Sequence, residues 1–160
     1  MKKSAIIAFV IVLILIVTGI IVFVRLNKEK KSITTSDFYS IMSQKEYNVV
    51  DATNQFAGYD YVKQASIAVN KNNTYQIEFY ELEDDDSAIY FYNYNKSIVE
   101  ESKGSSSAET KVELKNHAKY TLSTNGKYKV VSRINNTVIY LNVDEAFKDT
   151  VKNLLKELGY

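Results

Sequence analysis

An uncharged stretch of twenty residues near the amino end of the chain constrains the possible structures most strongly. Residues 5–24 read AIIAFVIVLILIVTGIIVFV, interrupted only by Thr18 and Gly19. At a helical rise of about 1.5 Å per residue, the stretch covers roughly 30 Å, the thickness of a bilayer's hydrocarbon core. It exceeds the roughly 7–15 apolar residues of a cleaved signal peptide, and no small-residue cleavage site comes after it. We therefore predict an uncleaved, single-pass transmembrane signal anchor that contacts the lipid bilayer through residues 5–24.

The anchor divides the chain into four parts. Residues 1–4 are a short tail, residues 5–24 the anchor, residues 25–35 a basic and polar juxtamembrane linker, and residues 36–160 a soluble α+β domain. Four basic residues after the anchor, against Lys2 and Lys3 before it, slightly favour a cytoplasmic domain. A short basic tail before a long apolar run is instead the usual arrangement of an anchor that exports its carboxyl-terminal domain. We expect a cell-membrane protein with an extracytoplasmic domain, and we keep a cytoplasm-facing adaptor as the alternative.

The charge of the domain argues against a nucleic-acid partner. Residues 1–31 hold six of the 20 basic and one of the 19 acidic side chains, which leaves 14 basic and 18 acidic, a net charge of −4. A basic patch for nucleic acid is therefore not expected on the domain. Lysine outnumbers arginine 18 to 2, a bias that suggests an AT-rich bacterial genome.

Three segments of the domain have the periodicity of amphipathic helices. The first begins at Thr35 or Ser36, the second spans residues 87–102 after an acidic first turn, and the third is capped by Asp144 and ended by Gly159. Their apolar stripes are Phe38, Ile41 and Met42; Ala88, Phe91, Tyr94 and Ile98; and Phe147, Val151, Leu154, Leu155 and Leu158.

Alternating apolar and polar residues predict a mainly antiparallel sheet packed by these helices. Strands are expected over residues 65–70, 74–82, 111–114, 119–123, 127–133 and 137–143, with an extended stretch at Val49 and Val50. A two-residue Asn135-Asn136 turn keeps the apolar side chains of the last hairpin on one face. For the preceding hairpin, a three-residue loop, Thr124-Asn125-Gly126, achieves the same result. The face predicted to lie under the last helix comprises Tyr120, Leu122, Tyr128, Val130, Ile139, Leu141 and Val143.

Most of the usual catalytic residue types are missing from the chain. It has no Cys, its only histidine is His117, and its five glycines form no phosphate-binding loop. No metal-ligand motif is present either, so we predict no catalytic residues, no metal and no cofactor. A membrane-anchored hydrolase that uses a carboxylate cluster near His117 is the alternative, because sequence does not reveal which carboxylates meet in space.

Tyrosine is the abundant residue that suggests a function. The chain has 13, and a tyrosine ring offers a large contact area with a polar end. We predict that some of them line a surface for a protein, peptide or glycan partner. The candidates are Tyr59, Tyr61, Tyr80, Tyr90, Tyr92 and Tyr140. The sequence thus favours a membrane-tethered, non-enzymatic binding or accessory domain.

Overall fold

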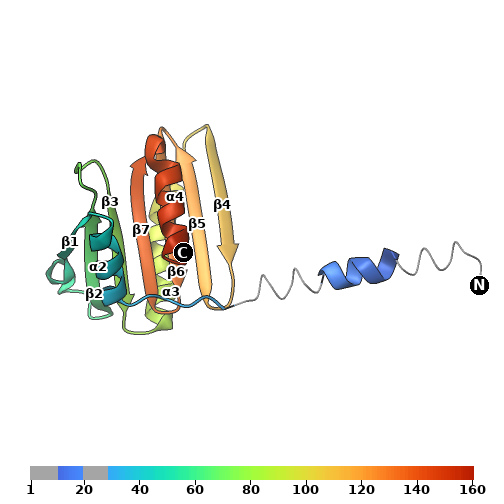
Figure 1. Cartoon of the computed structure of the whole chain (residues 1–160), viewed down its shortest axis with the longest axis horizontal. Coiled ribbons are helices and arrows are strands. Elements are labelled where there is room, and N and C mark those ends of the chain that lie inside the picture. The colour runs from blue at the N-terminus through green and yellow to red at the C-terminus, as the bar shows by residue number, and fades with distance from the viewer. Residues whose placement is uncertain (1–10, 20–28) are drawn as a thin grey trace, which may run out of the picture.

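The computed structural model describes residues 11–19 and 29–160 of the chain. Residues 11–19 are helical, whereas residues 5–10 and 20–24 of the predicted anchor lie outside the described residues. Within the described ranges, no helix is long and apolar enough to cross a bilayer. The later part of the chain folds around a seven-stranded antiparallel sheet with helices on both faces, which confirms the predicted α+β class (Figure 1).

The sheet consists of two runs of neighbouring antiparallel strands that meet in its middle. The strands are β1 (Asn48–Asp51), β2 (Val62–Val69), β3 (Gln76–Leu82), β4 (Ser107–Glu113), β5 (His117–Thr124), β6 (Lys127–Ile134) and β7 (Thr137–Asp144). Their order in space is β1-β2-β3-β7-β6-β5-β4. The last strand therefore lies in the centre of the sheet, between β3 and β6, and joins the two runs.

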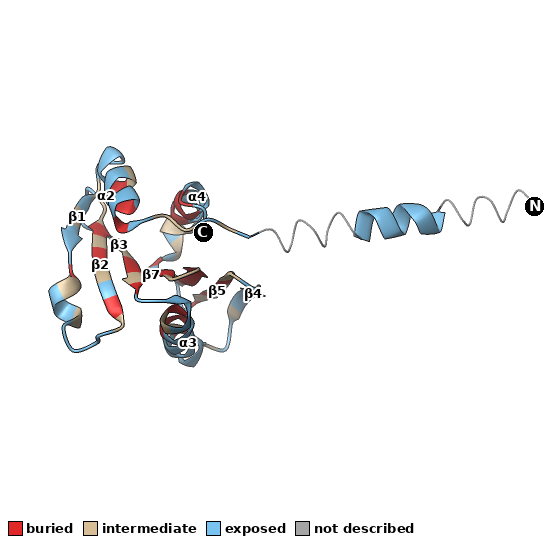
Figure 2. Ribbon diagram, turned by 90° about the horizontal axis from the view of Figure 1, so that it is seen from below, coloured by how far each residue is buried: buried red, intermediate tan, exposed pale blue. Residues whose placement is uncertain are grey.

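Two helices cover one face of this sheet and a third covers the other. Figure 2 shows α2 (Thr35–Gln44) and α4 (Lys148–Glu157) above the sheet and α3 (Asp85–Glu101) below it. Helix α3 connects β3 in the sheet interior to β4 at its edge, so the connection itself provides the cover for that face. Two short 3₁₀ helices, η1 (Thr53–Phe56) and η2 (Glu145–Phe147), come after β1 and β7.

Each face of the sheet buries its own apolar core. The α2/α4 face buries Phe38, Met42, Ala68, Ile77, Phe79, Tyr128, Val130, Ile134, Ile139, Leu141, Val143, Val151, Leu154, Leu155, Leu158 and Tyr160. The α3 face buries Ala52, Val62, Ala65, Tyr80, Leu82, Ala88, Phe91, Tyr92, Val99, Ala118, Tyr120, Leu122, Val131 and Val138. Burial of apolar area on both faces is the main source of the domain's stability.

Of the two predicted hairpin registers near the carboxyl end, that of β6–β7 is confirmed and that of β5–β6 is wrong. The Asn135-Asn136 turn has two residues and pairs Val130 with Leu141, which confirms that prediction. The three-residue loop predicted for the other hairpin is wrong, because Thr124 pairs directly with Lys127 around a two-residue turn.

This register places Tyr120 and Leu122 on the α3 face, away from the predicted face under α4. The sequence argument assumed one buried face. Because α3 covers the second face, the tight Asn125-Gly126 turn, with both residues at positive φ, leaves these two side chains fully buried.

The helices differ from the predictions at two caps and in one buried stripe. Thr34, rather than Thr35 or Ser36, caps α2 through a capping box with Asp37. Asp144 makes no capping hydrogen bond to α4, which starts only at Lys148, after η2. In α3, Tyr92 and Val99 are buried instead of the predicted Tyr94 and Ile98, which are exposed.

The predicted end of α4 at Gly159 is confirmed. Gly159 has a φ of +89°, its N–H donates to the carbonyl of Lys156, and the N–H of Tyr160 donates to the carbonyl of Leu155. This pair of bonds is a Schellman motif, which requires the left-handed conformation that glycine adopts without steric cost.

Candidate binding groove

Four of the six predicted tyrosines line one cavity on the α3 face. The cavity has a volume of about 340 Å³ and lies between the η1–β2 segment, strand β3 and helix α3. We call it the aromatic groove. Its lining residues are Phe56, Tyr59, Tyr61, Tyr80, Tyr90, Phe91, Tyr94 and Asn95.

Local backbone hydrogen bonds hold the segment that forms one wall of the groove. The N–H of Tyr59 donates to the carbonyl of Phe56, and the N–H of Val62 donates to the carbonyl of Tyr59, both at 2.8 Å. The carbonyl of Tyr61 accepts from the N–H of Glu83 at 3.0 Å, which ties the wall to the start of the α3 connection. The turns therefore position the wall from both ends.

The floor of the groove consists of two buried rings. Tyr80 of β3 and Phe91 of α3 are 6% and 7% exposed, and their ring centroids lie 4.6 Å apart. Phe56 of η1 packs edge-on against Tyr80 at 5.3 Å, with an interplanar angle of 82°. Edge-to-face pairs of this kind are the favoured arrangement of aromatic quadrupoles.

Packed tyrosine rings also form the solvent-exposed rim of the groove. Tyr61 packs against Tyr59 on one side and against Tyr90 on the other, with centroids 5.8 Å apart in each pair. Tyr59, Tyr90 and Tyr94 are each more than half exposed. Residues 90 and 94 are one helical turn apart, so both rings stand on the same side of α3. The groove thus presents tyrosine rings to a partner while its floor stays covered.

The lining of the groove is electrically neutral near pH 7. None of its lining residues is Asp, Glu, Lys, Arg or His. The Tyr80 hydroxyl donates to Glu78 Oε2 at 2.6 Å, and burial together with that carboxylate raises the pKa of Tyr80 far above its usual value. Burial and the neighbouring tyrosines also raise the pKa of Tyr61. The groove is therefore suited to an uncharged ligand rather than to acid–base chemistry.

The remaining two predicted tyrosines lie outside the groove. Tyr92 faces the sheet, is 2% exposed, and has a hydroxyl with no hydrogen-bond partner within the described parts of the chain. Together with Arg133 it borders a separate pocket of about 270 Å³. Tyr140 is half-buried on β7 opposite Glu78, whose charge adds to burial in raising the pKa of Tyr140. Neither side chain contributes to the groove's lining.

Sequence reasoning missed four residues of the groove: Phe56, Phe91, Tyr94 and Asn95. The i, i+4 spacing of Tyr90 and Tyr94 was the one available signal, because such residues share a helix side. Phe91 was assigned only to the core stripe, and nothing in the sequence places Phe56 beside β3. Asn95 is held by a 2.9 Å bond from its side-chain amide to the carbonyl of Phe91.

The structure places His117 beside an amide side chain and two basic residues. The Nδ1 atom of His117 lies 3.0 Å from Oδ1 of Asn116. Burial and the positive charges of Lys30 and Arg133 lower the pKa of His117, which favours the neutral form of the ring. Across residues 11–19 and 29–160, no group of three or more His, Cys, Asp or Glu side chains is arranged to hold a metal. The charged neighbours of the ring are cations, rather than the carboxylates that the alternative hypothesis requires.

Comparison with known proteins provides no functional assignment. No protein-family model, curated protein or solved structure matches the chain.

Proposed function

We propose that the chain is a membrane-tethered, extracytoplasmic, non-enzymatic binding domain whose aromatic groove holds an extended, proline-containing peptide segment of a partner protein. The observation that supports the proposal most directly is the unbroken series of packed rings from Phe56 through Tyr80, with Tyr59, Tyr61 and Tyr90 forming the rim. Aromatic-lined grooves bind such peptides well, because a polyproline II segment loses little conformational entropy on binding.

The polar groups of the groove favour a peptide over a glycan. A glycan presents many hydroxyls, each of which needs a hydrogen-bonding partner when it loses water. Apart from tyrosine hydroxyls, Asn95 is the one polar side chain in the lining, and one of its two side-chain N–H groups is bonded to the carbonyl of Phe91. An apolar peptide side chain or a proline ring needs contact area, which the rings provide, and few hydrogen bonds.

Chain connectivity supports a position close to the membrane. Lys30 is joined to the domain by two bonds to Asn116: its N–H donates to Oδ1 at 3.2 Å, and its carbonyl accepts from Nδ2 at 2.7 Å. Only residues 25–29 separate Lys30 from the proposed anchor, so the six steps from Val24 to Lys30 reach at most about 22 Å at about 3.6 Å per residue. The domain would then stay within a short distance of the bilayer.

Protease accessibility in intact cells tests the tether and its orientation. We expect the domain to be degraded in intact cells and the chain to stay with the membrane fraction after an alkaline wash. Protection until lysis would contradict the extracytoplasmic orientation and favour the cytoplasm-facing adaptor. Release by the wash would contradict the anchor.

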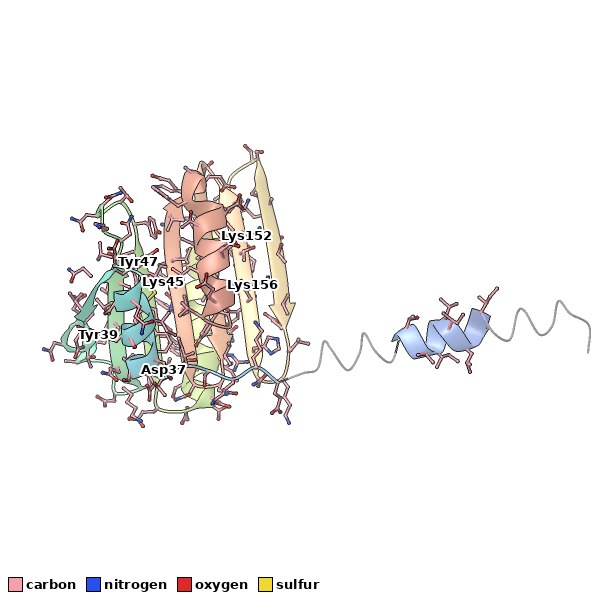
Figure 3. All side chains as sticks on the ribbon, viewed as in Figure 1. Asp37, Tyr39, Lys45, Tyr47, Lys152 and Lys156 are labelled. Atoms are coloured by element: carbon pink, nitrogen blue, oxygen red, sulfur yellow. The ribbon has the colours of Figure 1, made fainter. Side chains whose placement is uncertain are left out.

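A peptide-binding measurement tests the groove. The full chain in detergent is screened against a library of extended peptides with and without proline, and affinities are measured for wild type, Tyr59→Ala and Tyr90→Ala. Tyr39→Ala is the matched control, because Tyr39 is 55% exposed and lies on α2, on the other face of the sheet (Figure 3).

We expect each groove variant to weaken binding at least about tenfold and the control to leave it unchanged, because exposed aromatic residues are typical energetic centres of interfaces. Equal affinity in the groove variants and the control would exclude the groove as the binding surface. Selective binding of neutral oligosaccharides in place of peptides would exclude the peptide assignment.

A further inference from the structure

A second groove, on the opposite face of the sheet, is lined by four lysines. It lies between α4 and strands β4 and β5 and has a volume of about 440 Å³. Lys119 enters it from β5, and Lys148, Lys152 and Lys156 enter it from α4. We call it the lysine groove. The net charge of −4 gave no indication of it, because a charge sum over the domain does not show where the charges gather.

The helical repeat of α4 aligns three of these lysines. Residues 148, 152 and 156 are spaced four apart, so their side chains form one stripe with a repeat of about 6 Å along the helix. Figure 3 shows Lys152 and Lys156 on the same side of α4, where the helix lies over β5. The apolar stripe of α4 is buried next to them and leaves the ammonium groups above the sheet surface.

The lysine groove lacks the carboxylates that balance lysines elsewhere in the domain. Lys96, Lys103 and Lys127 each form an ion pair with Glu or Asp. In the groove only Lys148 is paired: its Nζ contacts Oε1 of Glu145 at 2.7 Å.

No Asp or Glu lines the lysine groove. Among the described residues, Lys119, Lys152 and Lys156 have no carboxylate within the 4.0 Å of an ion pair. The groove therefore has uncompensated positive charge.

Lys119 shows how unfavourable this arrangement is without a counter-charge. Burial, with the charges of Lys30 and Lys152, lowers the pKa of Lys119 to about 8. A bound anion would raise this pKa again, because its negative charge favours the charged form of each nearby ammonium group. The hydroxyls of Thr110 and Thr121 also line the groove and add neutral hydrogen-bonding groups, whereas the Ser123 hydroxyl donates to Oε1 of Glu145.

We propose that the lysine groove is a binding site for a phosphate-bearing anion with two or more phosphate groups. Ammonium groups are compact point charges that bind phosphate oxygens well, and their 6 Å repeat suits an anion with successive charges. The tyrosines of the groove, Tyr128 and Tyr160, are only 4% exposed, so they provide no exposed ring on which a nucleobase stacks. The site therefore recognises phosphate rather than a nucleic acid.

Titration with inorganic tripolyphosphate tests the proposal. The full chain is held in a zwitterionic detergent, and heat of binding is measured for wild type and for the double variant Lys152→Gln/Lys156→Gln. Lys71→Gln/Lys63→Gln is the matched control, since it also removes two exposed lysine charges but on the β2–β3 side of the domain. None of these four lysines is buried, so the variants keep the core intact.

We expect tripolyphosphate to bind wild type, and the groove variant to lose about tenfold or more in affinity, or about 1.4 kcal/mol. The control pair should change it less than about twofold, and added salt should weaken binding because the site is exposed. An equal loss in both double variants would overturn the proposal, since it would indicate a non-specific response to net charge. The proposal would also be overturned if tripolyphosphate does not bind and the lipid experiment described next shows no protection.

A second arm distinguishes a soluble phosphate from a lipid headgroup. Acetylation of Lys119, Lys152 and Lys156 is followed by mass spectrometry with the full chain in nanodiscs of phosphatidylcholine or of phosphatidylcholine with cardiolipin, a lipid whose headgroup carries two phosphates. Protection only by cardiolipin would identify the bound phosphates as those of a lipid headgroup. Protection by tripolyphosphate in pure phosphatidylcholine would identify a soluble ligand, and either result supports the phosphate site.

Discussion

The ring of Tyr61 lies edge-on against the ring of Tyr90, with centroids 5.8 Å apart and an interplanar angle of 80°. Tyr61 stands beside the start of β2, whereas Tyr90 stands on the second turn of α3. This contact closes the aromatic groove across two elements that are distant in sequence. It also makes the groove a preformed surface, since a partner does not have to bring the two walls together.

A double-mutant cycle measures this contact. Tyr61→Ala, Tyr90→Ala and the double variant are compared by urea unfolding of the full chain. We expect a coupling energy of about 0.5–1.5 kcal/mol, the usual value of a well-oriented aromatic pair. A cycle between Tyr90 and the remote Tyr39 should give a coupling near zero, and comparable coupling in both cycles would contradict the contact.

The turn that sets the β5–β6 register depends on Gly126. Its φ of +72° is costly for a residue with a Cβ, so Gly126→Ala should destabilise the domain by about 1 kcal/mol or more. Gly58→Ala is the control, because an added Cβ there meets no atom within 4 Å and Gly58 has no positive φ. Thermal or urea unfolding checks both. Equal stability of the two variants would exclude the tight turn.

Removal of each of two buried tyrosine hydroxyls should have a different effect on the free energy of unfolding. The Tyr92 hydroxyl has no partner among the described residues, so Tyr92→Phe should leave stability unchanged or raise it slightly. The Tyr160 hydroxyl is hydrogen-bonded to that of the buried Thr137, so Tyr160→Phe should cost about 1 kcal/mol. The free energy of unfolding from urea titration distinguishes the two. A clear loss for Tyr92→Phe would indicate a water or ligand bound at its hydroxyl.

The lowered pKa of Lys119 predicts a pH dependence with a defined sign. Its folded-state pKa is about 8, whereas the usual value for lysine is 10.5. Between these values the unfolded chain binds the proton and the folded chain does not, so this lysine makes stability rise with pH from about 8 upwards. Unfolding of wild type should therefore show a steeper positive slope over pH 8 to 9.5 than unfolding of Lys119→Gln. A shallower slope in wild type would contradict the shift.

Competitive acetylation provides an independent measure of the same group. Lys119 should lose its proton, and so react, with a midpoint near pH 8. Tripolyphosphate should move this midpoint upwards, because an adjacent anion stabilises the charged ammonium. A midpoint that does not change at saturating tripolyphosphate would place the anion elsewhere on the molecule.

Local patterns in the sequence predicted most of the secondary structure. The four-residue spacing of Phe38 and Met42 places both on the buried side of α2, as predicted. The Asn135-Asn136 turn keeps Val130 opposite Leu141, again as predicted. These features depend on helical and strand periodicity and on turn chemistry, which act between residues close in sequence.

The fold brings only some of the predicted binding residues together. Residue type can be read from the sequence, but the sequence does not show which residues are neighbours in the folded domain. Tyr59 and Tyr90 meet around Tyr61 only because α3 returns across the sheet beside the η1–β2 segment. Tyr92, two residues further along α3, faces the sheet and is buried instead. One helical residue corresponds to a rotation of about 100°, so Tyr92 lies about 200° around α3 from Tyr90 and has different surroundings.

The amino-acid pattern alone establishes the class of the domain, the order of its helices and strands, and the apolar run at residues 5–24. Long-range packing covers the sheet on both faces, which reversed the faces expected for Tyr120 and Leu122. The same packing brings Lys119 and Lys152 into one groove. Sequence periodicity determines which side of a helix or strand is apolar. Tertiary contacts determine which element lies opposite that side, so they could not be predicted from the periodicity.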